Sequence, residues 1–135
     1  MAANPNTRIA FFGALYFIVG AASVVLARAA GSGQATFYWR WAAFAISGAI
    51  FAWHIAREWL RHQGTVREIA WRAAAGVALG AFLLALMANI HEVFTASSFR
   101  PRMLTALVGW PLLTGLPAFL VALAAGAALA RTERR

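Results

Sequence analysis

The sequence predicts an all-α membrane protein, a four-transmembrane-helix bundle with both termini in the cytoplasm (N-in/C-in) and a Pro-kinked fourth helix. Three observations lead to this fold class: 62% of the 135 residues are hydrophobic, the mean hydropathy is +0.68, and short arginine-bearing segments separate four long apolar stretches. Soluble domains are about 45–50% apolar, and a chain this short cannot bury such an excess in one core. We expect a single integral membrane domain over residues 1–135.

The first apolar run, residues 9–27, lies between Arg8 and Arg28 and holds no charge. As a helix it would cover roughly 28 Å, close to the hydrocarbon thickness of a bilayer. Asn6 or Thr7 is expected to cap its start. A cleaved signal peptide is the alternative, because a small residue, Arg28 and a second small residue form a cleavage-like pattern at residues 27–29.

The second predicted span covers residues 38–57, with Arg40 and Arg57 reaching to the two interfaces. Aromatic residues gather at both of its ends, as expected of interfacial belts: Tyr38, Trp39, Trp41, Trp53 and Trp59.

The third predicted span covers residues 72–92 and follows the second after a short turn. Gly64 is expected to close the preceding helix in the left-handed conformation. Thr65 and Glu68 have the spacing of a capping box, which predicts the start of the next helix.

The fourth apolar stretch, residues 103–130, is too long for one crossing because it would extend roughly 42 Å as a helix. Proline is favoured at the first position of a helix, so we expect the crossing to start near Pro111 and to cover about residues 110–130. Pro117 should then kink this helix early.

The orientation follows from the arginines. With the N-terminus inside, eight arginines lie in cytoplasmic segments and four in outer loops, which favours N-in/C-in by the positive-inside rule. Arginine without lysine, together with abundant Ala and Gly, suggests a GC-rich bacterial genome. We therefore expect a multi-pass protein of the bacterial cytoplasmic (inner) membrane.

Small residues at four-residue spacing mark the faces expected to pack. Gly76 and Gly80 form such a pair in the third span, and Ala122 and Gly126 form one in the fourth. These faces could build the bundle itself or a dimer.

Polar residues gather where the third span ends and the next loop begins: Asn89, His91, Glu92, Arg100 and Arg102. They predict an interfacial salt bridge that fixes the loop, or an outer-face site for an anion, a lipid headgroup or a partner. On the cytoplasmic side, Glu58 is expected to pair with Arg61 and His62 on a solvated hairpin near anionic headgroups.

Catalytic and cofactor sites are not expected. His54 and His91 should lie at opposite ends of their helices, roughly 25 Å apart along the membrane normal, so they cannot share a haem or metal. The chain has no Cys or Asp, and it shows no phosphate-binding or dinucleotide motif. Its arginines are scattered singly between apolar runs, which argues against a nucleic-acid partner.

The sequence therefore favours a non-catalytic accessory or scaffold subunit of a larger membrane complex, with the lipid bilayer and another membrane protein, or a second copy, as partners. The alternative is a small oligomeric transporter or channel whose pathway is lined by the kinked region: Gly109, Pro111, Thr114, Gly115 and Pro117. In length and number of spans the chain resembles the small four-helix membrane subunit of tripartite solute transporters.

Overall fold

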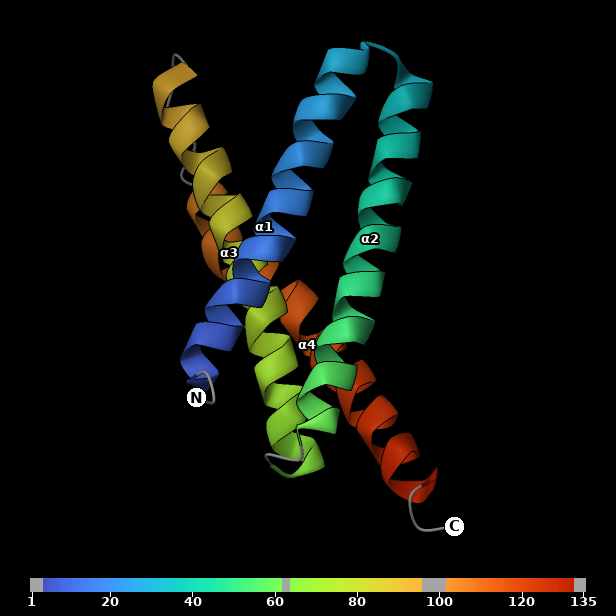
Figure 1. The fold of residues 1–135 in the computed structure, drawn as a ribbon. Coiled ribbons are helices and arrows are strands. Elements are labelled where there is room, and N and C mark those ends of the chain that lie inside the picture. The colour runs from blue at the N-terminus through green and yellow to red at the C-terminus, as the bar shows by residue number, and fades with distance from the viewer. Residues whose placement is uncertain (1–3, 62–63, 96–101, 133–135) are drawn as a thin grey trace.

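The computed structural model describes residues 4–61, 64–95 and 102–132, and these residues form four long helices. The helices are α1 (Pro5–Ala30), α2 (Gly33–Leu60), α3 (Val66–Thr95) and α4 (Arg102–Thr132). Their directions alternate along the chain (Figure 1). The predicted all-helical class is therefore confirmed for the described residues.

Three of the four helices are long and apolar enough to cross a membrane: α1, α3 and the segment Met103–Thr132 of α4. Helix α2 is of similar length, but it carries Arg40, Arg57 and Glu58 within its bounds. Its Trp and Tyr residues lower its hydropathy further, because their rings carry polar atoms. The predicted crossing by α2 thus remains a prediction.

The start of α1 differs in detail from the predicted cap. Asn4 is the N-cap, and its side chain accepts a hydrogen bond from the backbone N–H of Asn6 at 3.1 Å, with Pro5 at the first helical position. Asn6 and Thr7 are already inside the helix, so the cap prediction was wrong by two to three residues. At the other end Gly31, with φ of 66°, adopts the left-handed conformation that glycine tolerates best.

The turn between α2 and α3 contains the predicted capping box. Glu68 Oε2 accepts from the Thr65 N–H at 2.8 Å, and Thr65 Oγ1 accepts from the Glu68 N–H at 3.3 Å. Gly64 has a positive φ of 150°, but it does not close α2, because Arg61 is the C-cap in a right-handed conformation. The capping box is confirmed, and the role predicted for Gly64 is corrected.

Helix α4 is one continuous element from Arg102 to Thr132, with Pro111 and Pro117 both inside it. Pro111 is therefore not the first residue of a helix, while the start of the membrane crossing near Pro111 and the kink at Pro117 stay predictions. Helices accept an internal proline when nearby groups satisfy the freed carbonyls. The Thr114 hydroxyl donates to the carbonyl of Trp110 at 3.0 Å and lies 3.3 Å from that of Pro111. The carbonyls that lose a donor to the two prolines are instead those of Leu107 and Leu113, four residues before each proline.

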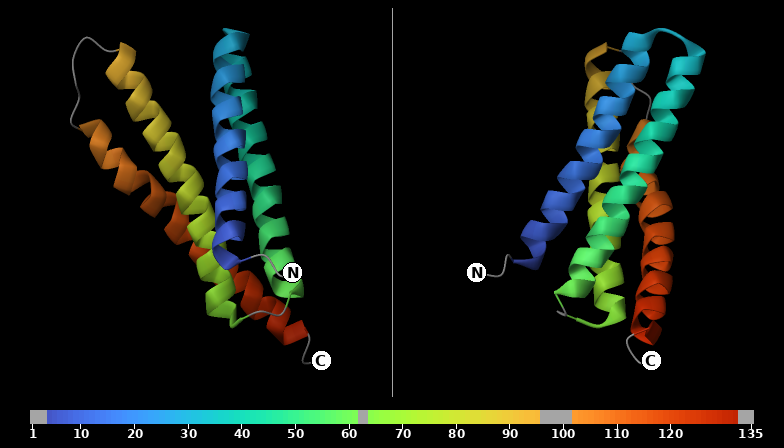
Figure 2. Two further views of the ribbon diagram at one scale, coloured as in Figure 1. Left: turned by 60° about the vertical axis from the view of Figure 1, so that its left-hand side comes forward. Right: turned by 45° about the vertical axis from the view of Figure 1, so that its right-hand side comes forward.

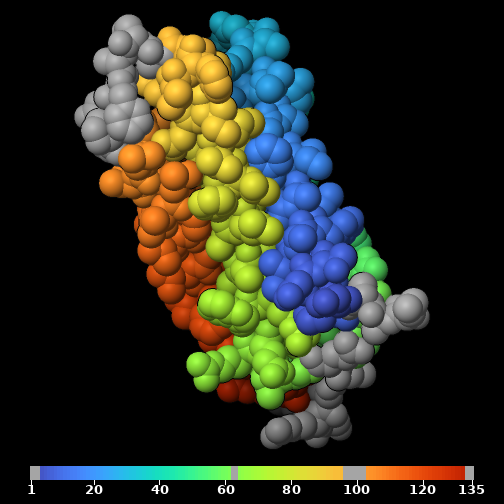
Figure 3. Space-filling model, turned by 90° about the vertical axis from the view of Figure 1, so that its left-hand side faces the viewer, coloured from blue at the N-terminus to red at the C-terminus, as the bar shows by residue number. Residues whose placement is uncertain are grey.

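The start of α1, the end of α2, the start of α3 and the end of α4 lie at one end of the bundle, which we call the lower end. The opposite ends of the four helices lie at the upper end (Figure 1). Helix α3 lies between α1 and α4 (Figure 3), and the described residues of α1 and α4 do not contact each other. The α1–α2 hairpin and the α3–α4 hairpin converge toward the lower end and diverge toward the upper end (Figure 2). A small apolar core fills the lower half: Ile55, Ala70, Ala73 and Ala122.

Candidate functional site

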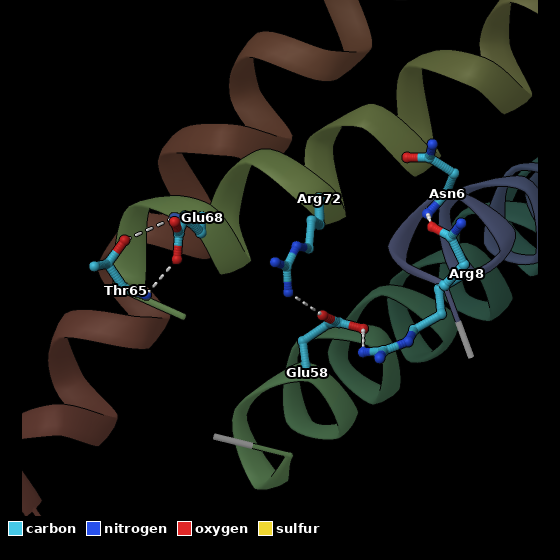
Figure 4. A network of polar contacts seen from close by, with 7 residues as sticks. Asn6, Arg8, Glu58, Thr65, Glu68 and Arg72 are labelled. Atoms are coloured by element: carbon cyan, nitrogen blue, oxygen red, sulfur yellow. Dashed lines mark hydrogen bonds and ion pairs between the residues drawn. The ribbon is translucent and has the colours of Figure 1, made fainter. Parts of the chain in front are cut away.

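A buried carboxylate in the lower half joins three helices. Glu58 of α2 is 2% exposed. Its Oε1 accepts from Arg8 Nη1 of α1 at 3.1 Å, and its Oε2 accepts from Arg72 Nη1 of α3 at 3.3 Å (Figure 4). We call Arg8, Glu58 and Arg72 the ion triad. Both carboxylate oxygens are occupied, so the triad fixes the relative position of α1, α2 and α3.

The triad is the lowest of a series of layers between the parallel helices α1 and α3. Moving four residues along each helix from Arg8 and Arg72 leads to Phe12 and Gly76, and four more residues lead to Tyr16 and Gly80. A Cβ on Gly76 would lie 3.4 Å from Phe12 Cβ, and one on Gly80 would lie 2.6 Å from Tyr16 Cβ. A fixed sequence offset therefore relates the facing residues of α1 and α3. Gly76 and Gly80 therefore pack against α1 within this chain, and the lack of a Cβ leaves room for side chains of α1.

His54 fills the layer above the triad. Its ring is fully buried and stacks on Phe12, with the ring centroids 3.6 Å apart and the planes 9° from parallel. Gly76 leaves room for it, because a Cβ there would lie 3.2 Å from His54 Cε1. Among the described residues, neither ring nitrogen of His54 has a hydrogen-bond partner. A buried polar group without a hydrogen-bond partner lowers the free energy of unfolding by about 1–3 kcal/mol. His54, with two such nitrogens, is the least satisfied group of the site.

The hydroxyl of Tyr16 is in a similar position one layer higher. Tyr16 is 7% exposed, and the described part of the chain offers its oxygen no hydrogen-bond partner. The site thus runs from a fully paired ion triad through a stacked histidine to a buried phenol. The described residues contain no group of three His, Cys, Asp or Glu side chains arranged to hold a metal ion.

The environment predicted for Glu58 was wrong. Glu58 was expected on a solvated hairpin, paired with Arg61 and His62, whereas its carboxylate is buried and bonds to Arg8 and Arg72. His62 lies outside the described residues. The available signal was the spacing of His54, Ile55 and Glu58, which places all three on one face of α2, and these are the buried residues of that helix.

The polar set at the upper end is only partly brought together. Asn89 is buried, and its Nδ2 donates to the carbonyl of Ala85 at 2.8 Å and to that of Met103 at 3.0 Å, which ties α3 to the start of α4. His91 is exposed and Glu92 is half-buried. Arg100 and the side chain of Arg102 lie outside the described part, so the predicted salt bridge or anion site stays a prediction.

The predicted pathway residues do not share one environment. Pro111 and Gly115 line a groove between α3 and α4, while Pro117 is exposed on the other side of the helix. Gly109 is half-buried, and nothing lies within 4 Å of where its Cβ would be. Thr114 is half-buried and bonds to its own helix.

The small residues of α4 are buried against the lower part of α3. Ala122 is fully buried in the core cluster, and a Cβ on Gly126 would lie 2.7 Å from Val66 Cγ1. These two positions therefore pack α4 within this chain, at the lower end of the bundle.

No protein-family model matches this chain, and no match was found among curated proteins or solved structures. The chain is thus described by its own features: a helical protein with three membrane-compatible helices and a buried ion triad.

Proposed function

We propose that the protein is a non-catalytic accessory or scaffold subunit of a larger complex in the bacterial inner membrane, with its termini in the cytoplasm. The observation that carries this proposal is a row of exposed aromatic side chains on the upper half of α2. Phe37, Tyr38, Trp41 and Phe44 are each more than half exposed, and we call them the aromatic ridge.

The aromatic ridge is internally ordered. The rings of Phe37 and Trp41 lie 6.0 Å apart, those of Trp41 and Phe44 also 6.0 Å apart, and both pairs meet edge to face. The three residues follow a helical spacing of four and three, so they form one continuous strip. Large aromatic residues are enriched in the energetically dominant parts of protein interfaces, which makes a partner helix a suitable cover for this strip.

The ion triad supports a structural role for the lower half. Polar residues within a membrane are functional candidates by default. Here both oxygens of Glu58 bond to arginines, and the carboxylate is almost inaccessible. Such a group positions helices and is not presented to a substrate, which agrees with a scaffold.

Co-purification of the tagged protein in mild detergent, with mass spectrometry and sizing, tests this proposal. We expect one larger membrane protein at fixed stoichiometry. The double variant Trp41→Ala/Phe44→Ala should lower its recovery more than tenfold, because truncation of a central aromatic anchor typically costs 2 kcal/mol or more.

Trp110→Ala is the matched control, since Trp110 is also an exposed tryptophan but lies on α4. It should leave the recovery unchanged. A homogeneous monomer or homo-oligomer without a partner would overturn the proposal, and so would equal loss of the partner in both variants.

The second candidate, a small transporter or channel, has weaker support. It predicts that the α4 segment around the prolines lines a polar pathway. Pro111 and Gly115 do border a groove, but Leu112 and Leu116 border it as well, and the Thr114 hydroxyl is bonded within its own helix. Solute flux into liposomes that contain the purified protein, abolished by Gly115→Leu, would favour this candidate.

A further inference from the structure

A long groove runs along the flank of the bundle between α3 and α4, on the lower half. The groove has a volume of roughly 900 Å³, and its walls are formed by small residues of α3 and apolar residues of α4. Ala75 and Ala78 border it on one side, and Leu112 and Phe119 border it on the other. Gly115 lies at its floor, where a Cβ would approach Ala78 Cβ at 3.2 Å.

The lower mouth of the groove is basic. Arg67 is exposed there, and Arg72 contributes a partly exposed guanidinium whose Nη1 also bonds Glu58. Glu68 lies at the same mouth, but its Oε2 is turned onto the Thr65 N–H in the capping box. The start of α3 adds the positive end of a helix dipole. The mouth therefore attracts a negative group and the wall above it attracts a hydrocarbon.

The length of the groove matches one bilayer leaflet. From Thr65, just before α3, to Ala78 within α3, the groove extends about 20 Å at the rise of an α-helix. Half of a hydrocarbon core is about 15 Å, and the interfacial layer adds several more. Trp71, 66% exposed, lines the lower part of the groove at the depth expected for an interfacial aromatic.

We propose that this groove binds one anionic phospholipid, with an acyl chain along the small-residue wall and the headgroup phosphate at Arg67. Basic pockets between membrane helices are suited to anionic lipid headgroups by charge and shape. The site does not depend on the proposed subunit role, because it uses another helix pair and another face than the aromatic ridge.

Native mass spectrometry of the full chain, delipidated and then exposed to equal phosphatidylglycerol and phosphatidylcholine, tests the proposal. We expect one tightly retained phosphatidylglycerol per chain. Arg67→Gln should lower the preference for phosphatidylglycerol about fivefold, as expected for one interfacial arginine. Ala75→Phe, which fills the groove, should abolish retention of both lipids.

Arg131→Gln is the matched control, because it removes an exposed arginine near the lower end of α4 that does not line the groove. It should retain the wild-type preference. Circular dichroism and gel filtration verify that each variant is folded. Equal retention of the two lipids by the wild type, or full retention in Ala75→Phe, would overturn the proposal. A lipid-free dimer that Ala75→Phe dissociates would do the same, since a second copy would then occupy the groove.

Discussion

The two halves of α2 differ sharply in how they meet the rest of the protein. Near the lower end α2 buries His54, Ile55 and Glu58 against α1 and α3. Along residues 33–53, all of which the structure describes, α2 has no buried residue and instead presents the aromatic ridge. The same helix is thus a structural element of the bundle at one end and an exposed surface at the other. The comparison teaches that the buried contacts of α2 with the rest of the chain are confined to the lower half of that helix.

The largest expected effect comes from removing the centre of the ion triad. Glu58→Ala should lower the free energy of unfolding by about 3–5 kcal/mol, because it removes the buried carboxylate to which the guanidinium groups of Arg8 and Arg72 both bond. Thermal or denaturant unfolding in a fixed detergent measures this change. Glu68→Ala, which removes an exposed carboxylate, should cost about 1 kcal/mol, because the Thr65 N–H loses its acceptor in the capping box.

A triple variant separates the charge from the packing. Arg8→Met, Glu58→Leu and Arg72→Met together should recover most of the stability lost in Glu58→Ala, because an apolar set of similar volume avoids the unpaired charges. If the triple variant were as unstable as Glu58→Ala, the loss would reflect packing, and the account of the triad would be wrong.

The next effect concerns the contact between α1 and α3. Gly80→Ala should lower the free energy of unfolding by about 1–3 kcal/mol, because the new Cβ would lie 2.6 Å from Tyr16 Cβ and 3.0 Å from the Gly13 carbonyl oxygen. Gly109→Ala, where the Cβ meets open space, should instead be neutral or stabilising by up to about 1 kcal/mol. Similar losses in both variants would contradict the close approach of α1 and α3.

A smaller effect of opposite sign is expected at His54. His54→Phe should raise the free energy of unfolding by about 1 kcal/mol, since it keeps the stack on Phe12 and removes two buried, unpartnered nitrogens. The unfolding assay above measures the change, and His91→Phe at an exposed position is the control. A loss of stability in His54→Phe would show that the imidazole makes a favourable polar contact in the membrane.

The smallest effect is expected at the upper end. Asn89→Leu should cost about 0.6 kcal/mol, the average of an interhelical hydrogen bond in a membrane, because it removes the bond to the Met103 carbonyl. Thr114→Val removes only bonds within α4 and should be neutral. A cost for Asn89→Leu comparable to that of Glu58→Ala would contradict the contrast between the two halves.

Local features of the fold could be read from the sequence, and features that depend on long-range packing could not. The lengths of the apolar runs predicted the helices, and the spacing of Thr65 and Glu68 predicted the capping box, since both are set by neighbouring residues. The partners of Glu58 lie 50 and 14 residues away in the chain. Nearby Arg61 and His62 offered an equally plausible local pairing, and only the packing of α1 and α3 around α2 decides between them.

The same distinction explains why the position of Pro111 inside α4 was not predicted. Proline at residue 111 is compatible with the start of a helix and with the interior of one, so the local sequence allowed both. The contacts of Gly115 with Ala78, and the hydroxyl of Thr114, belong to the continuous helix. The groove between α3 and α4 arises where small residues of α3 face Gly115 and the larger apolar residues of α4, which periodicity on either helix alone does not reveal.

The order in which the triad residues leave the ribosome has a consequence for membrane insertion. Arg8 and Glu58 belong to the first hairpin, and Arg72 follows only with α3. If the chain is inserted into a membrane as proposed, Glu58 would neutralise Arg8 within the first hairpin before α3 is synthesised. Arg72 would then bond to the second carboxylate oxygen of Glu58, which favours one register of α3 beside α1. The ion triad would thus set, during synthesis, the position of the second hairpin relative to the first.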